Sequence, residues 1–322
     1  MSGFTITAGV SFSGGFTFTE APSENTAAWF GGGFAGTVQS NVISSTVDRI
    51  TYATDTATTT GRGPLSSARY SLAATGNSYD GWFAGGHPGP VSRVDRITYA
   101  TDTATASVRG PLSQARGGMG AASNATDGWF GGGTSTVDRI TYASDTTTAT
   151  ARGPLSSARG GIGAAGNTTD GWFGGGGPGP GSTVARITYA TDTDTASVRG
   201  PLSLGAGGVA AAGNTTNAWF GGGYVGSPIF TGYRSYVQRI TFATDTATAS
   251  VRGPLSSARY SLAAAGNTTD GWFGAGEGPS PPSIFYTSRI DRITYATDTV
   301  TASVRGSLNI SKRILAAAGG MQ

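Results

Sequence analysis

The chain has 322 residues, of which 54 are glycine, and its net charge is +3. It contains no cysteine and a single histidine, His87, which excludes disulfide scaffolds, thiolate sites and catalysis or metal binding by histidine clusters. The small positive charge is spread along the chain and gives no reason to expect nucleic-acid binding. The first residues lack a basic segment followed by a long apolar run, so we expect neither a signal peptide nor membrane insertion.

Residues 1–23 alternate apolar side chains with Thr and Ser around Gly14-Gly15. This period of two predicts a β-hairpin with one apolar face. Because an isolated hairpin is marginal in water, it is expected either to pack on its own domain or to bind a partner by strand addition. We favour an anchor, formed by the apolar residues Phe4, Ile6, Val10, Phe12, Phe16 and Phe18.

Residues 24–322 contain six near-copies of one unit, each with a tryptophan followed by phenylalanine. The tryptophans are Trp29, Trp82, Trp129, Trp172, Trp219 and Trp272. The first copy lacks the small apolar segment that opens the others, and the chain ends on that segment, at residues 311–319. One repeat is therefore split between the two ends of the chain, which indicates a closed ring.

Each copy predicts four short strands. In chain order these are a small apolar run such as 260–265, an aromatic run such as 272–274, an alternating run such as 94–100, and a run such as 105–109. Four antiparallel strands per repeat of this length are typical of a propeller blade. The sequence therefore predicts an all-β, six-bladed β-propeller of four-stranded antiparallel blades, in which the C-terminal strand closes the first blade.

Two recurring aspartates have structural rather than catalytic interpretations. Asp-Arg pairs such as Asp138-Arg139 recur in four copies, and a catalytic carboxylate would not be needed so often. We interpret them as ion pairs between strands or blades. The aspartate of the Thr-Asp-Thr segment, such as Asp102, is interpreted as a turn residue rather than a calcium ligand.

The order of the elements resembles the kelch repeat over residues 24–322. The matching residues are a diglycine after the aromatic strand (Gly85-Gly86), a hairpin tyrosine (Tyr99) and an arginine that opens the next repeat (Arg69). The resemblance implies a β-propeller. The recurring sequence YATDTATASVRGPLSSAR is similar to sequences in repeat proteins of tailed bacteriophages, particularly marine and cyanobacterial ones. That similarity implies a virion protein made in the host cytoplasm.

The copies differ most between the diglycine and the third strand, and this segment is long in the first, fifth and sixth copies. In a closed ring these copies are neighbours, so their loops are expected on one side of one face. Aromatic and arginine side chains there are expected either to bind a partner or to pack the loops onto the propeller. The candidate recognition residues are Phe34, Tyr224, Phe230, Tyr233, Arg234, Tyr236, Phe285, Tyr286 and Arg289.

These observations favour a non-enzymatic virion module, associated with a tail or fibre, without catalytic residues, metal or cofactor. The N-terminal extension is expected to bind other virion proteins, and the loops a host-surface glycan or protein. The alternatives are a capsid decoration protein, a cellular kelch-type interaction module and a glycan-active enzyme. An enzyme of that kind needs clustered acids, whereas Glu277 is the only glutamate after Glu24. The oligomeric state stays open, with a homo-oligomer in the virion as one option.

Overall fold

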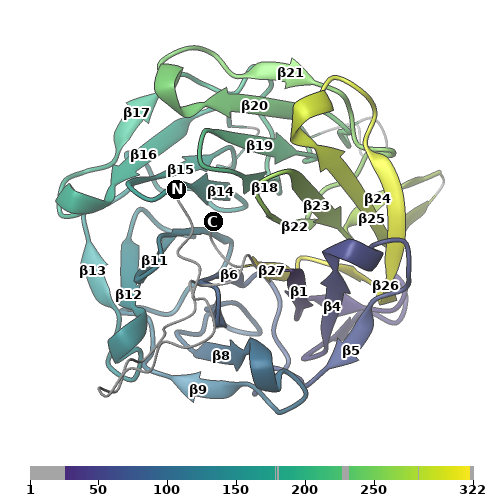
Figure 1. The fold of residues 1–322 in the computed structure, drawn as a ribbon, viewed down its shortest axis with the longest axis horizontal. Coiled ribbons are helices and arrows are strands. Elements are labelled where there is room, and N and C mark those ends of the chain that lie inside the picture. The colour runs from purple at the N-terminus through teal and green to yellow at the C-terminus, as the bar shows by residue number, and fades with distance from the viewer. Residues whose placement is uncertain (1–25, 178, 180, 227–231, 282, 320–322) are drawn as a thin grey trace, which may run out of the picture.

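The protein folds as a ring of antiparallel β-sheets around a common axis (Figure 1). The computed structural model describes residues 26–177, 179, 181–226, 232–281 and 283–319. Five sheets have four strands each, and the sixth has seven. We number the sheets 1 to 6 in the order of their tryptophans. The predicted propeller of four-stranded antiparallel sheets is confirmed, whereas sheet 6 is larger than predicted.

Strands follow one another outward from the axis, except that the innermost strand of sheet 1 is the last strand of the chain. For sheets 1 to 6, the innermost strands are β27 (Ala316–Gly319), β6 (Ala73–Gly76), β10 (Met119–Ser123), β14 (Gly163–Gly166), β18 (Ala210–Gly213) and β22 (Ala263–Gly266). The second strands are β1 (Ala27–Gly31), β7 (Asp80–Ala84), β11 (Asp127–Gly132), β15 (Asp170–Gly174), β19 (Asn217–Gly221) and β23 (Asp270–Gly274). The third strands are β4 (Val47–Thr51), β8 (Val94–Thr98), β12 (Val137–Thr141), β16 (Val184–Thr188), β20 (Val237–Thr241) and β25 (Ser283–Thr294). The fourth strands are β5 (Thr60–Arg62), β9 (Ser107–Arg109), β13 (Thr150–Arg152), β17 (Ser197–Arg199), β21 (Ser250–Arg252) and β26 (Ser303–Arg313).

Sheet 6 is enlarged where the ring closes. Its strands β25 and β26 are the longest of the described residues, and they continue beyond the length of their counterparts. A short strand, β24 (Glu277–Ser280), pairs with β25. Strands β2 (Phe34–Ala35) and β3 (Val42–Ile43), which come from the long loop of the first copy, extend the sheet beyond β26. The loop of sheet 1 is thus joined to sheet 6 by backbone pairing.

The split repeat is completed as predicted. Strand β27 pairs antiparallel with β1, in a register that runs from Ala28 opposite Gly319 to Gly31 opposite Ala316. The innermost strand of sheet 1 therefore comes from the far end of the chain.

A second closure lies close to the axis and uses only backbone groups. Six residues at equivalent positions each donate their N–H to the carbonyl of the preceding sheet's equivalent residue, at 2.7–2.9 Å, and the last bond returns to the first sheet. All six have a positive φ, between 53° and 73°, which explains why three are glycine. In ring order the residues are Ser71, Gly118, Gly161, Gly208, Ser261 and Ile314.

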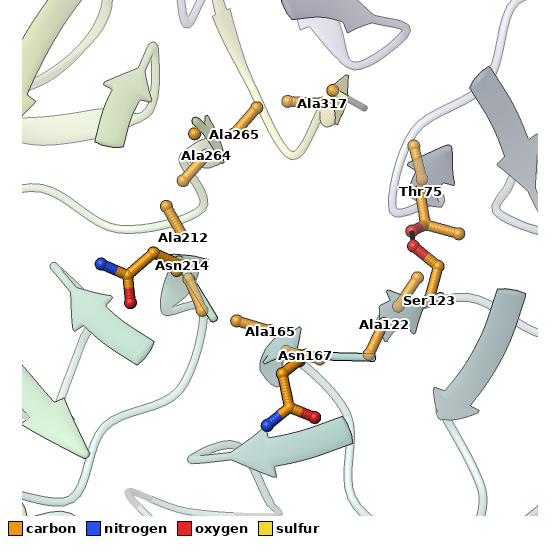
Figure 2. Close-up of a pocket in the computed structure, with 18 of the residues that line it drawn as sticks. Thr75, Ala122, Ser123, Ala165, Asn167, Ala212, Asn214, Ala264, Ala265 and Ala317 are labelled. Atoms are coloured by element: carbon orange, nitrogen blue, oxygen red, sulfur yellow. Dashed lines mark hydrogen bonds between the residues drawn. The ribbon is translucent and has the colours of Figure 1, made fainter. Parts of the chain in front are cut away.

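The inner strands carry small side chains, as predicted. They line an axial cavity of about 110 Å³ whose walls are mostly alanine (Figure 2). Two hydroxyl residues interrupt the alanines, and the Thr75 hydroxyl donates to Ser123 Oγ at 2.6 Å. Since small side chains permit close approach, the six inner strands can meet around one axis.

Adjacent sheets are joined by a repeated contact between a tryptophan and an aspartate. Each indole Nε1 donates to a carboxylate of the next sheet at 2.8–2.9 Å, and each indole stacks on an aromatic ring of that sheet at 3.7–3.9 Å between centroids. The six pairs are Trp29–Asp102, Trp82–Asp145, Trp129–Asp192, Trp172–Asp245, Trp219–Asp298 and Trp272–Asp55.

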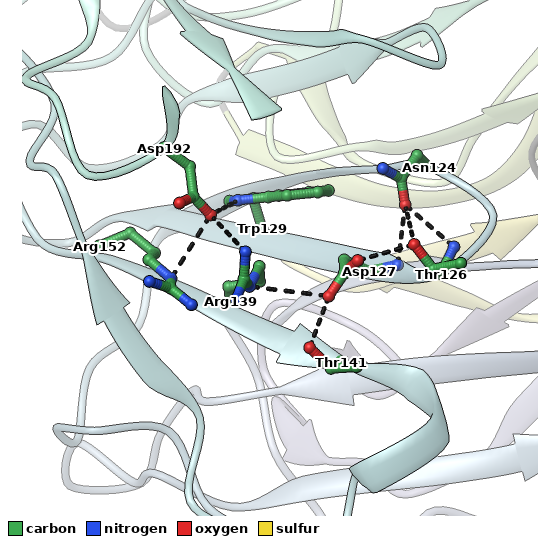
Figure 3. Close-up of polar contacts among 8 residues, drawn as sticks. All are labelled: Asn124, Thr126, Asp127, Trp129, Arg139, Thr141, Arg152 and Asp192. Carbon is green, nitrogen blue, oxygen red and sulfur yellow. Dashed lines mark hydrogen bonds and ion pairs between the residues drawn. The ribbon is translucent and has the colours of Figure 1, made fainter. Parts of the chain in front are cut away.

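Two arginines of the tryptophan's own sheet complete this contact, as Figure 3 shows for Asp192. Arg139 and Arg152 lie 3.1 and 3.4 Å from Asp192 Oδ2, beside the indole of Trp129. The same two arginine positions approach the aspartate at each of the six interfaces. The interpretation of this aspartate as a turn residue was therefore incomplete, since its carboxylate links two sheets.

The third strand ends earlier than predicted. In sheet 2 the predicted strand 94–100 ends at Thr98, because Tyr99–Thr101 form a 3₁₀ helix. Equivalent helices follow the third strand in every sheet: Tyr52–Thr54, Tyr142–Ser144, Tyr189–Thr191, Phe242–Thr244 and Tyr295–Thr297. The helix brings its aromatic ring and the following aspartate to the preceding sheet's tryptophan. The fourth strand is also shorter than the predicted 105–109, beginning at Ser107.

The recurring Asp-Arg aspartates form buried ion pairs, which confirms their structural interpretation. Each carboxylate on the third strand pairs with a cation from the connection that precedes its sheet. The pairs are Asp48–Lys312 (2.8 Å), Asp95–Arg69 (2.7 Å), Asp138–Arg116 (2.8 Å) and Asp291–Arg259 (3.0 Å). Lys312, the chain's only lysine, takes the place of arginine where the ring closes.

Replacing Asp192 by alanine should lower the free energy of unfolding by about 3 kcal/mol, because two arginines and one indole lose a buried acceptor. Asp192→Asn keeps an acceptor for Trp129 and should lose less. Asp194 is exposed in the same turn, so Asp194→Ala is the matched control. Denaturant unfolding measures all three. Equal losses for Asp192→Ala and Asp194→Ala would contradict the assigned contact.

Tyr99→Phe should make the protein less sensitive to alkali. Burial raises the pKa of Tyr99 well above its usual value, and its hydroxyl has no hydrogen-bond partner among the described residues. The unfolded state ionises above pH ~10 while the folded state does not, so wild type should lose about 1.4 kcal/mol more than the variant between pH 8 and pH 11. Unfolding free energies at the two pH values measure this. Identical losses would show that Tyr99 ionises freely in the fold.

Candidate binding surface

Two kinds of connection share one face of the ring. One joins the second and third strands of a sheet, and the other joins the fourth strand to the next sheet. Isolated bridges pair them directly, as between Tyr70 and His87 and between Tyr260 and Glu277. We call this side the loop face.

Side-chain size is distributed unevenly around the loop face. Each sheet has two equivalent positions on this face. One follows the diglycine, and the other lies in the segment that precedes the inner strand. Backbone pairing places the two side by side. From sheet 5 through 6 and 1 to 2 the pairs are Tyr224/Gly207, Glu277/Tyr260, Phe34/Arg313 and His87/Tyr70. Sheets 3 and 4 have Thr134/Gly117 and Gly177/Gly160. One side of the face therefore carries aromatic and charged groups, and the other carries mainly glycine.

The large side chains are organised by an ion pair between Glu277 and Arg313. Arg313 Nη1 lies 2.5 Å from Glu277 Oε2, and the Tyr233 hydroxyl donates to Glu277 Oε1 at 2.7 Å. The carboxylate is only 2% exposed. The guanidinium also lies over the rings of Phe34 and Tyr286, at 5.2 and 4.9 Å from their centroids. The ion pair therefore joins groups from sheets 1, 5 and 6.

Further aromatic contacts extend this centre in both directions. Towards sheet 5, the rings of Tyr224, Tyr233 and Tyr260 lie 5.3–5.5 Å from one another. Towards sheet 2, the ring centroids of Phe34 and Tyr70 are 4.2 Å apart, and those of Tyr70 and His87 are 5.3 Å apart. We call the whole set the aromatic arc: Phe34, Tyr70, His87, Tyr224, Tyr233, Tyr260, Glu277, Tyr286 and Arg313.

Three tyrosines of the arc, Tyr233, Tyr260 and Tyr286, are held in their neutral form. Burial, and then the hydrogen bond and charge of Glu277, raise the pKa of Tyr233. Burial is also the main cause of the raised pKa of Tyr260 and of Tyr286, where Arg313 acts in the opposite direction. These hydroxyls are therefore hydrogen-bonding groups at neutral pH rather than bases.

The glycine side, together with Gly207 where it borders the arc in sheet 5, is open above its backbone. A Cβ built on Gly207 would meet no atom within 4 Å, and one on Gly160 would meet only the Gly118 carbonyl, at 3.9 Å. At its margins the arc overhangs glycine: a Cβ on Gly117 would lie 2.7 Å from the His87 ring, and one on Gly208 would lie 2.8 Å from Tyr260. We call the open part, Gly160 and Gly207, the glycine floor.

The structure brings the three long loops into contact, but it divides their predicted recognition residues. Tyr233 and Tyr286 are each 6% exposed, and the Tyr286 hydroxyl donates to Asn41 of the first loop at 2.9 Å. These two side chains pack the loops together, which was the alternative to binding. Phe34, Tyr224 and Arg234 are half-buried, whereas Tyr236, Phe285 and Arg289 are exposed. Phe230 lies outside the described residues.

Five members of the arc were absent from the sequence-based set: Tyr70, His87, Tyr260, Glu277 and Arg313. Candidates were aromatic and arginine residues of the long loops. Tyr70, His87, Tyr260 and Arg313 lie outside those loops, and Glu277, although it begins the long loop of the sixth copy, is neither aromatic nor arginine. Aligning the copies would have indicated them, because Tyr70, Tyr260 and Arg313 stand where the other copies have glycine. Arg313 and Glu277 could not have been paired without the ring closure.

Several expectations are not addressed by these contacts. The anchor residues Phe4, Ile6, Val10, Phe12, Phe16 and Phe18 lie outside the described residues. Within the described part of the chain, no group of three or more His, Cys, Asp or Glu side chains is placed to hold a metal ion. No helix among those residues is long and apolar enough to cross a membrane.

Comparison with known proteins adds no family to this description. No protein-family model matches the chain, and no curated protein matches it either.

Proposed function

We propose that the protein is a non-enzymatic binding module of a tailed-phage virion, built as a six-bladed kelch-like propeller in which enlarged sheet 6 is the sixth blade. The module is associated with a tail or fibre, and its loop face recognises a ligand on the host surface, a glycan or a protein. The aromatic arc beside the glycine floor is the observation that carries the proposal.

The asymmetry of the loop face supports recognition. The inter-sheet contacts repeat six times, so they account for the ring but not for chemistry restricted to one side. Aromatic side chains provide large contact areas at low entropic cost, and aromatic and arginine side chains dominate binding energy at interfaces. The arc is held rigidly by Arg313 and Glu277, so little further ordering is needed when a ligand binds. The exposed Tyr236 and Phe285 lie in the loops of the adjoining sheets 5 and 6.

The chemistry of the arc supports binding rather than catalysis. Glu277 is its one carboxylate, and both of its oxygens are engaged, by Arg313 and Tyr233. A glycosidase of the usual kind needs two carboxyl groups flanking the bond that breaks. A virion location rests on the resemblance of the repeats to phage proteins and on the apolar alternation of residues 1–23. A capsid decoration protein and a cellular interaction module remain the alternatives for the same scaffold.

Tyr236→Ala and Phe285→Ala should each weaken ligand binding at least tenfold, because both are exposed aromatics on the proposed surface. A glycan array and adsorption to host cells identify the ligand class and measure the loss. Tyr79 is 59% exposed in a turn on the opposite face, so Tyr79→Ala is the matched control. If Tyr79→Ala alone abolished binding, recognition by the loop face would be wrong.

Under the anchor hypothesis, deletion of residues 1–22 should remove the protein from assembled particles while leaving its thermal unfolding unchanged, because an anchor contacts a partner rather than the propeller. Particle proteomics and the melting temperature of the purified variant measure the two effects. Incorporation at the wild-type level would contradict the anchor.

A further inference from the structure

Sheet 4 departs from the repeat at one buried ion pair. In sheets 1, 2, 3 and 6 a carboxylate on the third strand pairs with a cation from the preceding connection. In sheet 4 the carboxylate position is Ala185, whereas the cation, Arg159, is retained. Arg159 is 5% exposed and Ala185 is fully buried.

The environment of Arg159 reproduces that of Arg69 in sheet 2, apart from the carboxylate. Arg159 Nη1 donates to the carbonyls of Gly175 and Thr183 at 2.9 and 2.6 Å, and Nη2 to that of Phe173 at 3.4 Å. Arg69 makes the same three contacts, to Gly85, Arg93 and Phe83. The difference is the fourth contact, from Arg69 Nη2 to Asp95 at 2.7 Å. The guanidinium of sheet 4 is thus positioned as if to meet a carboxylate.

Sheet 5 shows how the fold accommodates the same position without charge. There the cation is replaced by Ala206 and the carboxylate by Gln238, whose amide bonds to Ser203 and Leu204. Sheet 4 has lost only the acid. A buried cation without a counterion destabilises the fold unless an anion neutralises it. Accordingly, burial lowers the pKa of Arg159, and no carboxylate among the described residues opposes that effect.

A second donor group stands beside this position. In sheet 2 the backbone N–H and the hydroxyl of Ser66 donate to the two oxygens of Asp95, at 3.2 and 2.6 Å. Ser156 is the equivalent residue in sheet 4, and it is exposed on the loop face, whereas Ser66 is half-buried. The donors that bind the Asp95 carboxylate are therefore present in sheet 4, and one of them faces solvent.

We propose that Arg159 and Ser156 bind a carboxylate anion in the place that Asp95 fills in sheet 2. The ligand takes two charge-assisted hydrogen bonds, from the guanidinium and from the serine N–H or hydroxyl. Its source is either a small dissolved carboxylate or an acidic side chain of a partner that reaches the loop face. The site lies in sheet 4, which contributes no residue to the aromatic arc, so the two are separate.

Thermal unfolding in sodium formate, against sodium chloride at equal ionic strength, tests the proposal on the full chain. Wild type should gain about 2 °C at a formate concentration ten times its Kd. Ala185→Asp places the carboxylate within the chain, so it should melt higher than wild type and respond equally to both salts. Ala185→Asn, of matched size but neutral, should not reproduce the gain of the aspartate.

Replacing formate by an N-acetyl, N′-methylamide derivative of aspartate separates the two sources. Stabilisation by formate alone identifies a dissolved anion, and stabilisation by both identifies a site that a partner's side chain can enter. Equal melting temperatures of wild type in formate and in chloride would overturn the proposal. A formate response that persisted unchanged in Ala185→Asp would overturn it as well.

Discussion

The hydrogen bond from each tryptophan to an aspartate of the next sheet is the contact on which the ring depends. It fixes the indole on the neighbouring aromatic ring and collects two arginines at one carboxylate, as for Trp129 and Asp192. The sixth bond, from Trp272 to Asp55, returns to the first sheet. Because a single sheet cannot bury both of its faces, closure leaves no sheet without a neighbour. The backbone ring at the axis also closes, with each N–H donating in the opposite direction, to the preceding sheet.

Local pattern was sufficient to predict the repeat, its strands and its closure. The two-residue period identified the strands, and the split copy at the two ends identified the ring. The partners of individual side chains were not predictable, since Trp29 and Asp102 are 73 residues apart and belong to different copies. For the same reason the sequence predicted a strand through Tyr99. That residue instead begins a 3₁₀ helix, and its ring packs against the indole of Trp29. Glu277 and Arg313 meet only because closure brings their segments together.

Function is expected where the copies stop being equivalent. Symmetric contacts maintain the scaffold, whereas the aromatic arc, the glycine floor and the buried Arg159 each belong to one part of the ring. Sheet 6 illustrates the relation, because its extra strands hold the first and last loops together and thereby position Phe34 beside Arg313. Arg313 itself is the last residue of β26, just before the strand that completes sheet 1. The surface proposed for recognition is therefore built on the seam at which the ring closes.

Native-state hydrogen exchange of a variant that lacks residues 315–322 tests the central claim, that closure makes the six sheets one cooperative unit. The deletion removes β27, the innermost strand of sheet 1. The account predicts that amide protection falls in the strands of all six sheets together. Full protection in sheets 2 to 5, with loss confined to sheet 1 and its immediate contacts, would contradict it.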